Sequence, residues 1–186
     1  MSQPEAPKIE FPCANYPVKV LGHGKDDFQP LGTDAYDTNA KVNPPLRSKS
    51  DVAAMIESLN KGTIDFIATD HAPHSEVDKM TTFQDSSFGI SVLETALGSL
   101  MTLVDQGHME VNTLIKKLTN DPATFLGMDI GNLKTGTSGD ITIIDPNETW
   151  TVDPGDFISK GKNTPLEGSL LKGKIKATFY QGTKVY

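Results

Sequence analysis

The chain has 186 residues, of which 37% are hydrophobic and 22% are charged, and this suits one globular domain or one domain and a fragment. Its net charge of −7 comes from charges mixed along the chain, so no basic stripe argues for nucleic-acid binding. The single cysteine, Cys13, excludes an internal disulfide, and the lack of a long apolar run or signal-peptide core predicts a cytoplasmic protein that binds no membrane.

Residues 1–31 are predicted to be an amino-terminal arm of uncertain origin. Residues 1–10 are polar and contain two prolines, whereas Val18–Leu21 alternates weakly enough to predict a short strand. His23 lies between two glycines, a setting more typical of a loop residue than of a metal ligand. Residues 9–22 weakly resemble the opening of a YbeD-like α/β domain.

A strand, a helix and a second strand are predicted between Lys41 and Ala68. The first strand ends at Asn43, because two prolines follow it and cannot donate to a sheet ladder. Ser48 or Ser50 caps the helix and Gly62 ends it. Short connections make the two strands parallel, which predicts Asn43 and Asp70 at the same rim of the sheet.

The second strand, Ile64–Ala68, leads directly into a polar cluster. Asp70 can ligate a divalent metal or take a proton, and His71 and His74 can ligate, donate or carry charge. Taken alone, one acid and two histidines are equally typical of a solvated loop, because they do not close a metal shell.

The middle of the chain is predicted to be helical after one long loop. Ser75–Ser87 is polar and mobile-looking; it is either a plain surface loop or a cover over a pocket. Gly89 either lets the backbone approach a ligand closely or marks the entry to the next helix. Helices are then predicted over residues 90–104, 112–118 and 120–126, with Glu94 as a structural contact.

From residue 131 the pattern changes to short β runs separated by turns. Strands are predicted over residues 140–145, 149–152 and 173–180, with Gln181-Gly182 as a hairpin turn. Trp150 and Phe179 are expected in the core of this β region.

The cluster Thr69-Asp70-His71-Ala72-Pro73-His74 closely resembles the signature of dihydroorotases in the cyclic amidohydrolase superfamily. Three other stretches agree with that family in the same order, namely residues 41–47, residues 88–96 and residues 161–165. The resemblance runs from about Gly32 to Tyr186 and implies an α/β fold. Residues 32–130 would be the carboxyl-terminal part of a TIM-like metal-dependent hydrolase barrel, and residues 131–186 part of a small β-sandwich.

The resemblance also implies a chemistry and the residues that perform it. Dihydroorotases reversibly hydrolyse the cyclic amide of dihydroorotate to N-carbamoyl-aspartate in pyrimidine biosynthesis, with zinc activating the attacking water. Asp70 matches the position of a metal ligand and acid–base group. Asn43, His74, Phe88 and Gly89 match positions that bind the substrate. His71 matches no ligand position and is interpreted as structural, and residues 161–165 match a family loop with a packing role.

Departures from the family predict that this chain is inactive alone. The family needs an H-x-H pair and further histidines, and no H-x-H occurs here. Asp70 alone cannot hold a catalytic zinc, and a closed barrel needs eight strands. The alternative reading is a non-catalytic dihydroorotase-like scaffold, which would pair with aspartate transcarbamoylase or form a homo-oligomer.

Overall fold

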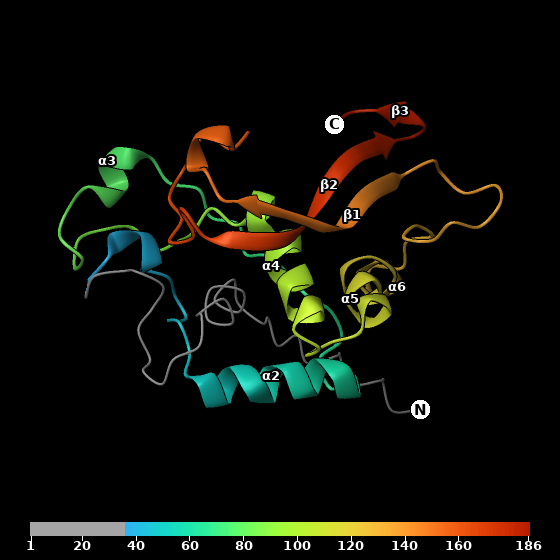
Figure 1. The fold of residues 1–186 in the computed structure, drawn as a ribbon, viewed down its shortest axis with the longest axis horizontal. Coiled ribbons are helices and arrows are strands. Elements are labelled where there is room, and N and C mark those ends of the chain that lie inside the picture. Colours follow the sequence, from blue (N-terminus) through green and yellow to red (C-terminus); the bar gives the residue numbers. More distant parts are fainter. Residues whose placement is uncertain (1–35) are drawn as a thin grey trace, which may run out of the picture.

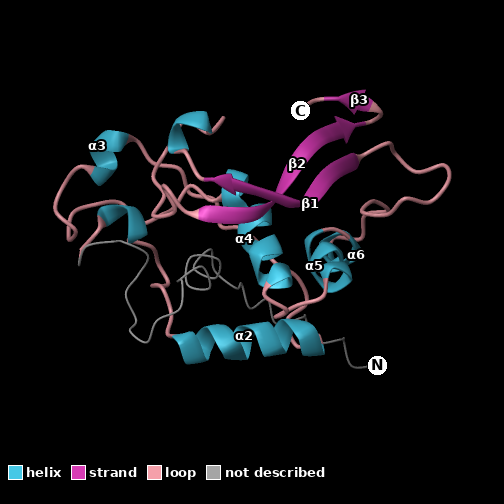
Figure 2. Ribbon diagram, viewed as in Figure 1, coloured by secondary structure: helices cyan, strands magenta, loops and turns pink. Residues whose placement is uncertain are grey.

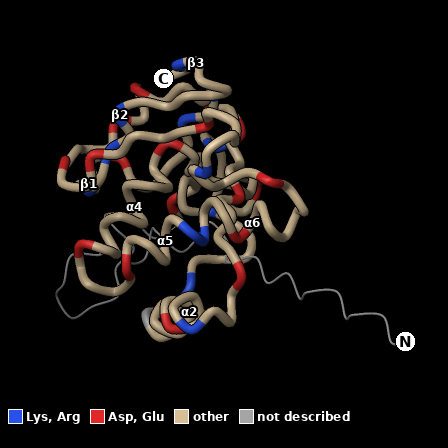
Figure 3. Tube along the Cα trace, turned by 90° about the vertical axis from the view of Figure 1, so that its right-hand side faces the viewer, with Lys and Arg blue, Asp and Glu red and all other residues tan. Residues whose placement is uncertain are grey.

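The structure is a computed structural model that describes residues 36–186, and the predictions made for Val18–Leu21, His23 and the rest of residues 1–31 lie outside this range. In the described part, helices lie against one face of a small antiparallel sheet, with α4 (Leu93–Asp105) between the sheet and α2 (Lys49–Lys61) (Figure 1, Figure 2). Acidic and basic residues are interspersed over the described chain (Figure 3), as their mixed order in the sequence predicts. No helix in this range has the length and apolar character needed to cross a membrane.

The prediction of paired strands at Lys41–Asn43 and Ile64–Ala68 is wrong for the described structure. Both segments lack strand assignment, and Ile64–Ala68 is only half-buried. Its backbone bonds go to a helix instead, because the Ile67 N–H donates to the Lys117 carbonyl at 3.1 Å and the Lys117 ammonium donates to the carbonyls of Ile64 and Asp65. A strand needs backbone hydrogen bonds to a neighbouring strand. Here the Lys117 side chain bonds the carbonyls of Ile64 and Asp65 instead.

Helix α2 begins and ends where the sequence predicts. Ser48 caps it in a reciprocal capping box with Asp51, and Gly62 closes it in the left-handed conformation. After the 3-10 turn η1 (Thr38–Ala40), this helix is the first long element of the described chain.

Helix α4 begins three residues later than the pattern predicts. Ile90 and Val92 are buried before the helix begins, and the Ile90 carbonyl accepts from the Ala72 N–H at 3.0 Å. Helical spacing alone could not separate these residues from the helix, because a buried extended segment is equally apolar. Two shorter helices follow close to their predicted ranges, α5 (Val111–Leu118) and α6 (Asn120–Phe125).

The β region forms one three-stranded sheet. The two strands predicted over residues 140–152 are a single strand, β1 (Ile141–Thr151), whose register shifts between Asp145 and Thr149. The 3-10 turn η2 (Pro154–Asp156) follows β1 in the chain. Strand β1 pairs antiparallel with β2 (Leu170–Tyr180). Strand β2 turns at Gln181-Gly182 and pairs with β3 (Thr183–Lys184). Both turn residues have positive φ, which matches a two-residue hairpin and confirms that prediction.

The sheet is joined to the helices through α4. A Cβ on Gly98 of α4 would lie 3.0 Å from the Trp150 ring and 3.1 Å from Leu171, so the absent side chain lets helix and sheet approach closely. The Trp150 indole N–H donates to the Gly173 carbonyl at 3.0 Å. Trp150 therefore packs against α4 in the described structure, while Phe179 is half-buried opposite Ile141.

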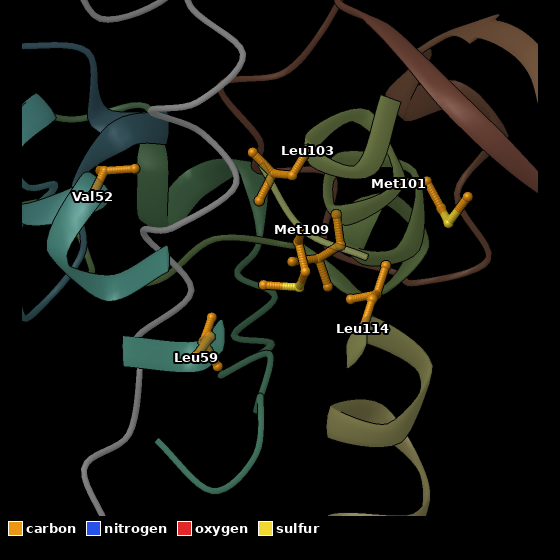
Figure 4. Close-up of a cluster of buried hydrophobic side chains, with 7 residues drawn as sticks. Val52, Leu59, Met101, Leu103, Met109 and Leu114 are labelled. Atoms are coloured by element: carbon orange, nitrogen blue, oxygen red, sulfur yellow. The ribbon is translucent and has the colours of Figure 1, made fainter. Parts of the chain in front are cut away.

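The largest apolar cluster lies on the other side of α4. Side chains from α2, α4, α5 and the turn before α5 form it (Figure 4), and its buried members are Val52, Leu59, Leu100, Met101, Leu103, Met109 and Leu114. A smaller cluster of Val42, Ile90 and Val92 lies beneath the segments that carry the candidate site.

Candidate functional site

Three chain segments that carry candidate site residues lie side by side. The Gly89 N–H donates to the Lys41 carbonyl at 3.0 Å, and the Ala72 N–H donates to the Ile90 carbonyl at 3.0 Å. These bonds join the segment that leads to Asn43, the loop Asp70–His74 and the segment Phe88–Ser91.

Asp70 ends the extended segment with its carboxylate exposed. Its φ of 48° places it in the left-handed region, which is uncommon for a residue with a side chain and occurs at functional turns. Asn43 is also exposed, and its peptide bond to Pro44 is cis. The placement of Asp70 and Asn43 at one rim stays a prediction.

His74 is held at two points. Its Nε2 lies 2.8 Å from the Phe88 carbonyl, and because a carbonyl only accepts, the proton of this bond belongs to Nε2. Its backbone N–H donates to the Asn163 side-chain oxygen at 2.8 Å. Nδ1 is therefore the ring nitrogen that is left for a ligand, as an acceptor in the neutral ring or a donor in the imidazolium.

Gly89 is required by a close approach between these segments. A Cβ there would lie 2.7 Å from His74 Nε2 and 2.8 Å from the Ala72 carbonyl, and φ is +147°. The residue before it, Phe88, is 57% exposed, with its ring 4.3 Å from the Lys41 ammonium. The absent side chain of Gly89 thus makes room for His74.

Two buried lysines, which sequence reasoning missed, hold the loop Ser75–Ser87. Lys41 donates to the carbonyls of Gln84 and Ser86, and Lys79 to those of Thr38 and Ser87. Lys79 ends the short helix α3 (Glu76–Lys79) inside this loop. Burial lowers the pKa of Lys79, the nearby positive charge of Lys41 lowers it further, and Asp37 opposes them.

His71 and Glu94 have structural contacts, as predicted for both. His71 Nδ1 accepts the backbone N–H groups of Val92 and Leu93 at 3.1 Å each, so the imidazole caps the start of α4. Glu94 accepts the Ser159 N–H at 2.7 Å through one carboxylate oxygen.

Asn163 is a further residue that the sequence does not predict, although residues 161–165 resemble a family loop. Its side chain is 6% exposed and bonds the His74 loop on one side and the segment Gly89–Ser91 on the other. An amide within the sequence Gly-Lys-Asn-Thr-Pro was the available signal, but nothing in the sequence gives its partners 70 to 90 residues away.

The family resemblance implies a metal, and the described residues do not fit a complete site for one. Within residues 36–186, no three His, Cys, Asp or Glu side chains are grouped closely enough to hold a metal ion. A protein zinc site takes three or four such ligands. Asp70 alone does not meet that need.

A model of the amidohydrolase family matches residues 32–185. The chain is 48% identical over 151 residues to a dihydroorotase of Syntrophus aciditrophicus, a match that covers 81% of this chain and 35% of the relative. It is 48% identical over 172 residues to a dihydroorotase of Geobacter metallireducens, covering 91% of this chain and 41% of the relative. The chain thus spans between a third and a half of the length of these relatives.

Solved structures of related enzymes share the fold. An L-hydantoinase (dihydropyrimidinase) from Arthrobacter aurescens superposes with a TM-score of 0.76 at 27% identity, over 92% of this chain and 38% of that one. A dihydropyrimidinase from Brevibacillus agri gives a TM-score of 0.76 at 22% identity, over 93% of this chain and 38% of that one. The described helices and strands therefore have the arrangement of a part of these larger chains.

Proposed function

The chain belongs to the amidohydrolase family, and on that premise we propose that it contributes the carboxyl-terminal part of a dihydroorotase-type active site. The reaction is the reversible hydrolysis of dihydroorotate to N-carbamoyl-aspartate in pyrimidine biosynthesis. The observation that carries the proposal is the identity of 48% to the two dihydroorotases. The contact between the His74 loop and the Phe88–Gly89 segment supports it.

Asp70 and His74 have separate roles in this proposal. As water adds to the ring carbonyl and the carbon–nitrogen bond breaks, the Asp70 carboxylate takes the water proton and delivers it to the leaving nitrogen. His74 binds the substrate carboxylate through Nδ1, which carries a proton when the ring is an imidazolium. Asn43 and the backbone of Phe88 and Gly89 would bind the remaining polar atoms of the substrate ring.

We further propose that the metal of this family is zinc here and that Asp70 is one of its ligands. When bound, zinc supplies hydroxide near neutral pH. Its other ligands would have to come from outside residues 36–186, because the described part holds no group of three ligands. Turnover would then require residues outside the described range.

The proposed division of the chain places a partial barrel at residues 32–130 and a partial β-sandwich at residues 131–186. Its support is that the last described helix ends at Phe125 and the first strand begins at Ile141. The close contact between Gly98 of α4 and Leu171 of β2 links the two parts.

Complementation tests the catalytic proposal. The 186-residue chain would be mixed with zinc and with the remaining portion of the Syntrophus dihydroorotase, and dihydroorotate turnover would be measured. We expect turnover from the mixture and a loss of at least about 100-fold with Asp70→Asn, the scale of a lost acid–base group. Asp65→Asn is the matched control, since Asp65 is an exposed carboxylate in the same segment.

Equal turnover with Asp70→Asn and the wild-type chain would contradict the assigned role. A second candidate function is a non-catalytic scaffold, and the incomplete ligand set of the described residues favours it. Under that proposal the mixture forms no active enzyme, and the chain instead co-purifies with aspartate transcarbamoylase or with a second copy of itself. Failure to bind either one would count against the scaffold.

A further inference from the structure

The side chain of Asn163 is hydrogen-bonded to two chain segments. Its oxygen accepts from the His74 N–H at 2.8 Å and lies 3.1 Å from the Ser91 hydroxyl oxygen, whose single proton goes to the Gly161 carbonyl at 2.7 Å. Its amide nitrogen donates to the Gly89 carbonyl at 3.0 Å and to the Ala72 carbonyl at 3.3 Å. The amide oxygen and both amide N–H groups therefore have partners, so no polar atom of this buried side chain remains unsatisfied.

The backbone around Asn163 is fixed in the same place. The Ser91 N–H donates to the Asn163 carbonyl at 2.7 Å, and the Ser91 hydroxyl donates to the Gly161 carbonyl at 2.7 Å. A Cβ on Gly161 would lie 2.6 Å from Pro73 and 2.7 Å from the His74 nitrogen, so this loop presses directly on the His74 loop. Asn163 therefore cannot shift without shifting both segments.

We propose that Asn163 is a positioning residue that sets the His74 loop against the Phe88–Gly89 segment. By fixing this spacing it keeps the bond from His74 Nε2 to the Phe88 carbonyl, and thereby leaves Nδ1 as the nitrogen offered to a ligand. This inference rests on the proposed function only for the identity of that ligand. The geometric link between Asn163 and the His74 ring is independent of it.

His71 provides an internal reference for the experiment. Its ring is fixed by the N–H groups of Val92 and Leu93 at the start of α4, and it makes no bond to Asn163. Because Nδ1 accepts both of these bonds, the neutral His71 ring carries its proton on Nε2, as His74 does. A change confined to His74 reports on positioning, whereas a change in both rings reports on a general loss of structure.

The experiment is NMR of the full chain, in which long-range proton–nitrogen correlations give the tautomer of each histidine at alkaline pH. His71→Gln and His74→Gln assign the signals. The test variant is Asn163→Leu, which keeps the branch at Cγ and has no polar side-chain atoms. The matched control is Thr164→Val, because Thr164 is the adjacent buried polar residue and its hydroxyl accepts the Leu166 N–H at 3.3 Å.

We expect Asn163→Leu to convert His74 from the Nε2–H form to a mixture of tautomers and to leave His71 unchanged. The exchange rate of the His74 backbone amide should rise about tenfold, the effect of losing one hydrogen bond. Thr164→Val should change neither ring. Ser91→Ala removes the hydroxyl that bonds the Gly161 carbonyl and contacts the Asn163 oxygen. It should give a smaller effect of the same kind, which keeps the test decisive where Asn163→Leu does not fold.

A folded Asn163→Leu chain with His74 unaltered would overturn the proposal, as would parallel changes in His71 and His74 in both test variants. Titration with dihydroorotate of the wild-type chain, mixed with zinc and the remaining portion of the Syntrophus dihydroorotase, separates this inference from the proposed function. If dihydroorotate leaves the His74 signals in place while Asn163→Leu moves them, the positioning role stands and the proposed substrate is wrong.

Discussion

At the scale of single residues, the candidate site depends on contacts that leave no spare volume. Gly89 and Gly161 both lie where an added Cβ would come within 2.8 Å of the His74 loop. The backbone at Gly89 and at Gly161 therefore packs directly against the His74 loop, and the Asn163 side-chain oxygen accepts the His74 N–H. A side chain added at Gly89 or Gly161 would change the site by pushing the His74 loop away, without changing any charge.

Replacing Gly89 by alanine should destabilise the chain by roughly 2–4 kcal/mol, because the new Cβ meets His74 Nε2 and φ is unfavourable for a side chain. Urea denaturation followed by tryptophan fluorescence would measure the change in the free energy of unfolding. Gly62→Ala is the control, since Gly62 also has positive φ but has no atom within 4 Å of the added Cβ. Equal effects of the two substitutions would show that the contact with His74 adds nothing.

The stability of the fold should rise with pH on the alkaline side because of Lys79. Its pKa in the folded chain is below the ordinary value of 10.5, so between these two values the unfolded chain binds more protons than the folded chain. The free energy of unfolding therefore increases with pH across that window. Urea denaturation at several alkaline pH values would measure the slope, and Lys79→Met should flatten it.

At the scale of elements, α4 has two packed faces. Leu100 and Leu103 belong to the helical cluster, while Gly98 meets Trp150 and Leu171 of the sheet. The cap from His71 and the contact of Glu94 with Ser159 fix the amino-terminal turn. This helix therefore connects the candidate site, the helices and the sheet.

Truncating Leu171 to alanine should cost about 2–5 kcal/mol, because its fully buried side chain fills the contact between β2 and α4. Leu170→Ala is the matched control on the same strand, since Leu170 is 53% exposed and should change stability by less than about 0.5 kcal/mol. Thermal unfolding followed by circular dichroism measures both. Equal costs would mean that the sheet does not stabilise α4.

The elements differ in how well the sequence alone predicts them. The ends of α2 follow from local chemistry, a serine cap and a left-handed glycine, and are predicted correctly. The strands at 41–43 and 64–68 depend on which neighbour takes their backbone groups, and the role of Lys117 has no local signal. For the same reason the sequence indicates His74 and Gly89 as candidates, but gives neither the Asn163 bonds nor the buried lysines.

At the scale of the whole molecule, the core is divided among three clusters of unequal size. The cluster between α2, α4 and α5 is the largest, a second lies under β1 and β2, and the third, beneath the candidate site, holds only Val42, Ile90 and Val92. Local stability follows the density of buried apolar contacts. The candidate site thus lies beside the smallest of these three clusters.

Hydrogen exchange should follow this division. We expect the amides of α4 to exchange slowest, because the helix is buried on two faces, and those of residues 65–71 to be among the fastest, because few of their backbone groups are bonded within the described structure. Mass spectrometry of peptides after exchange measures both segments in one experiment. Faster exchange in α4 than in the more exposed α2 would contradict the central place given to α4.

The two buried lysines have a consequence for chemical labelling. Acylating reagents attack neutral amines that they can reach, so surface lysines such as Lys61, whose side chain is 66% exposed, should be modified first. Lys41 and Lys79 should react only after the loop Ser75–Ser87 has separated from the segment around Thr38, because each ammonium is surrounded by carbonyl oxygens of these segments. The rate at which Lys41 and Lys79 are acylated should therefore report how often the loop Ser75–Ser87 opens.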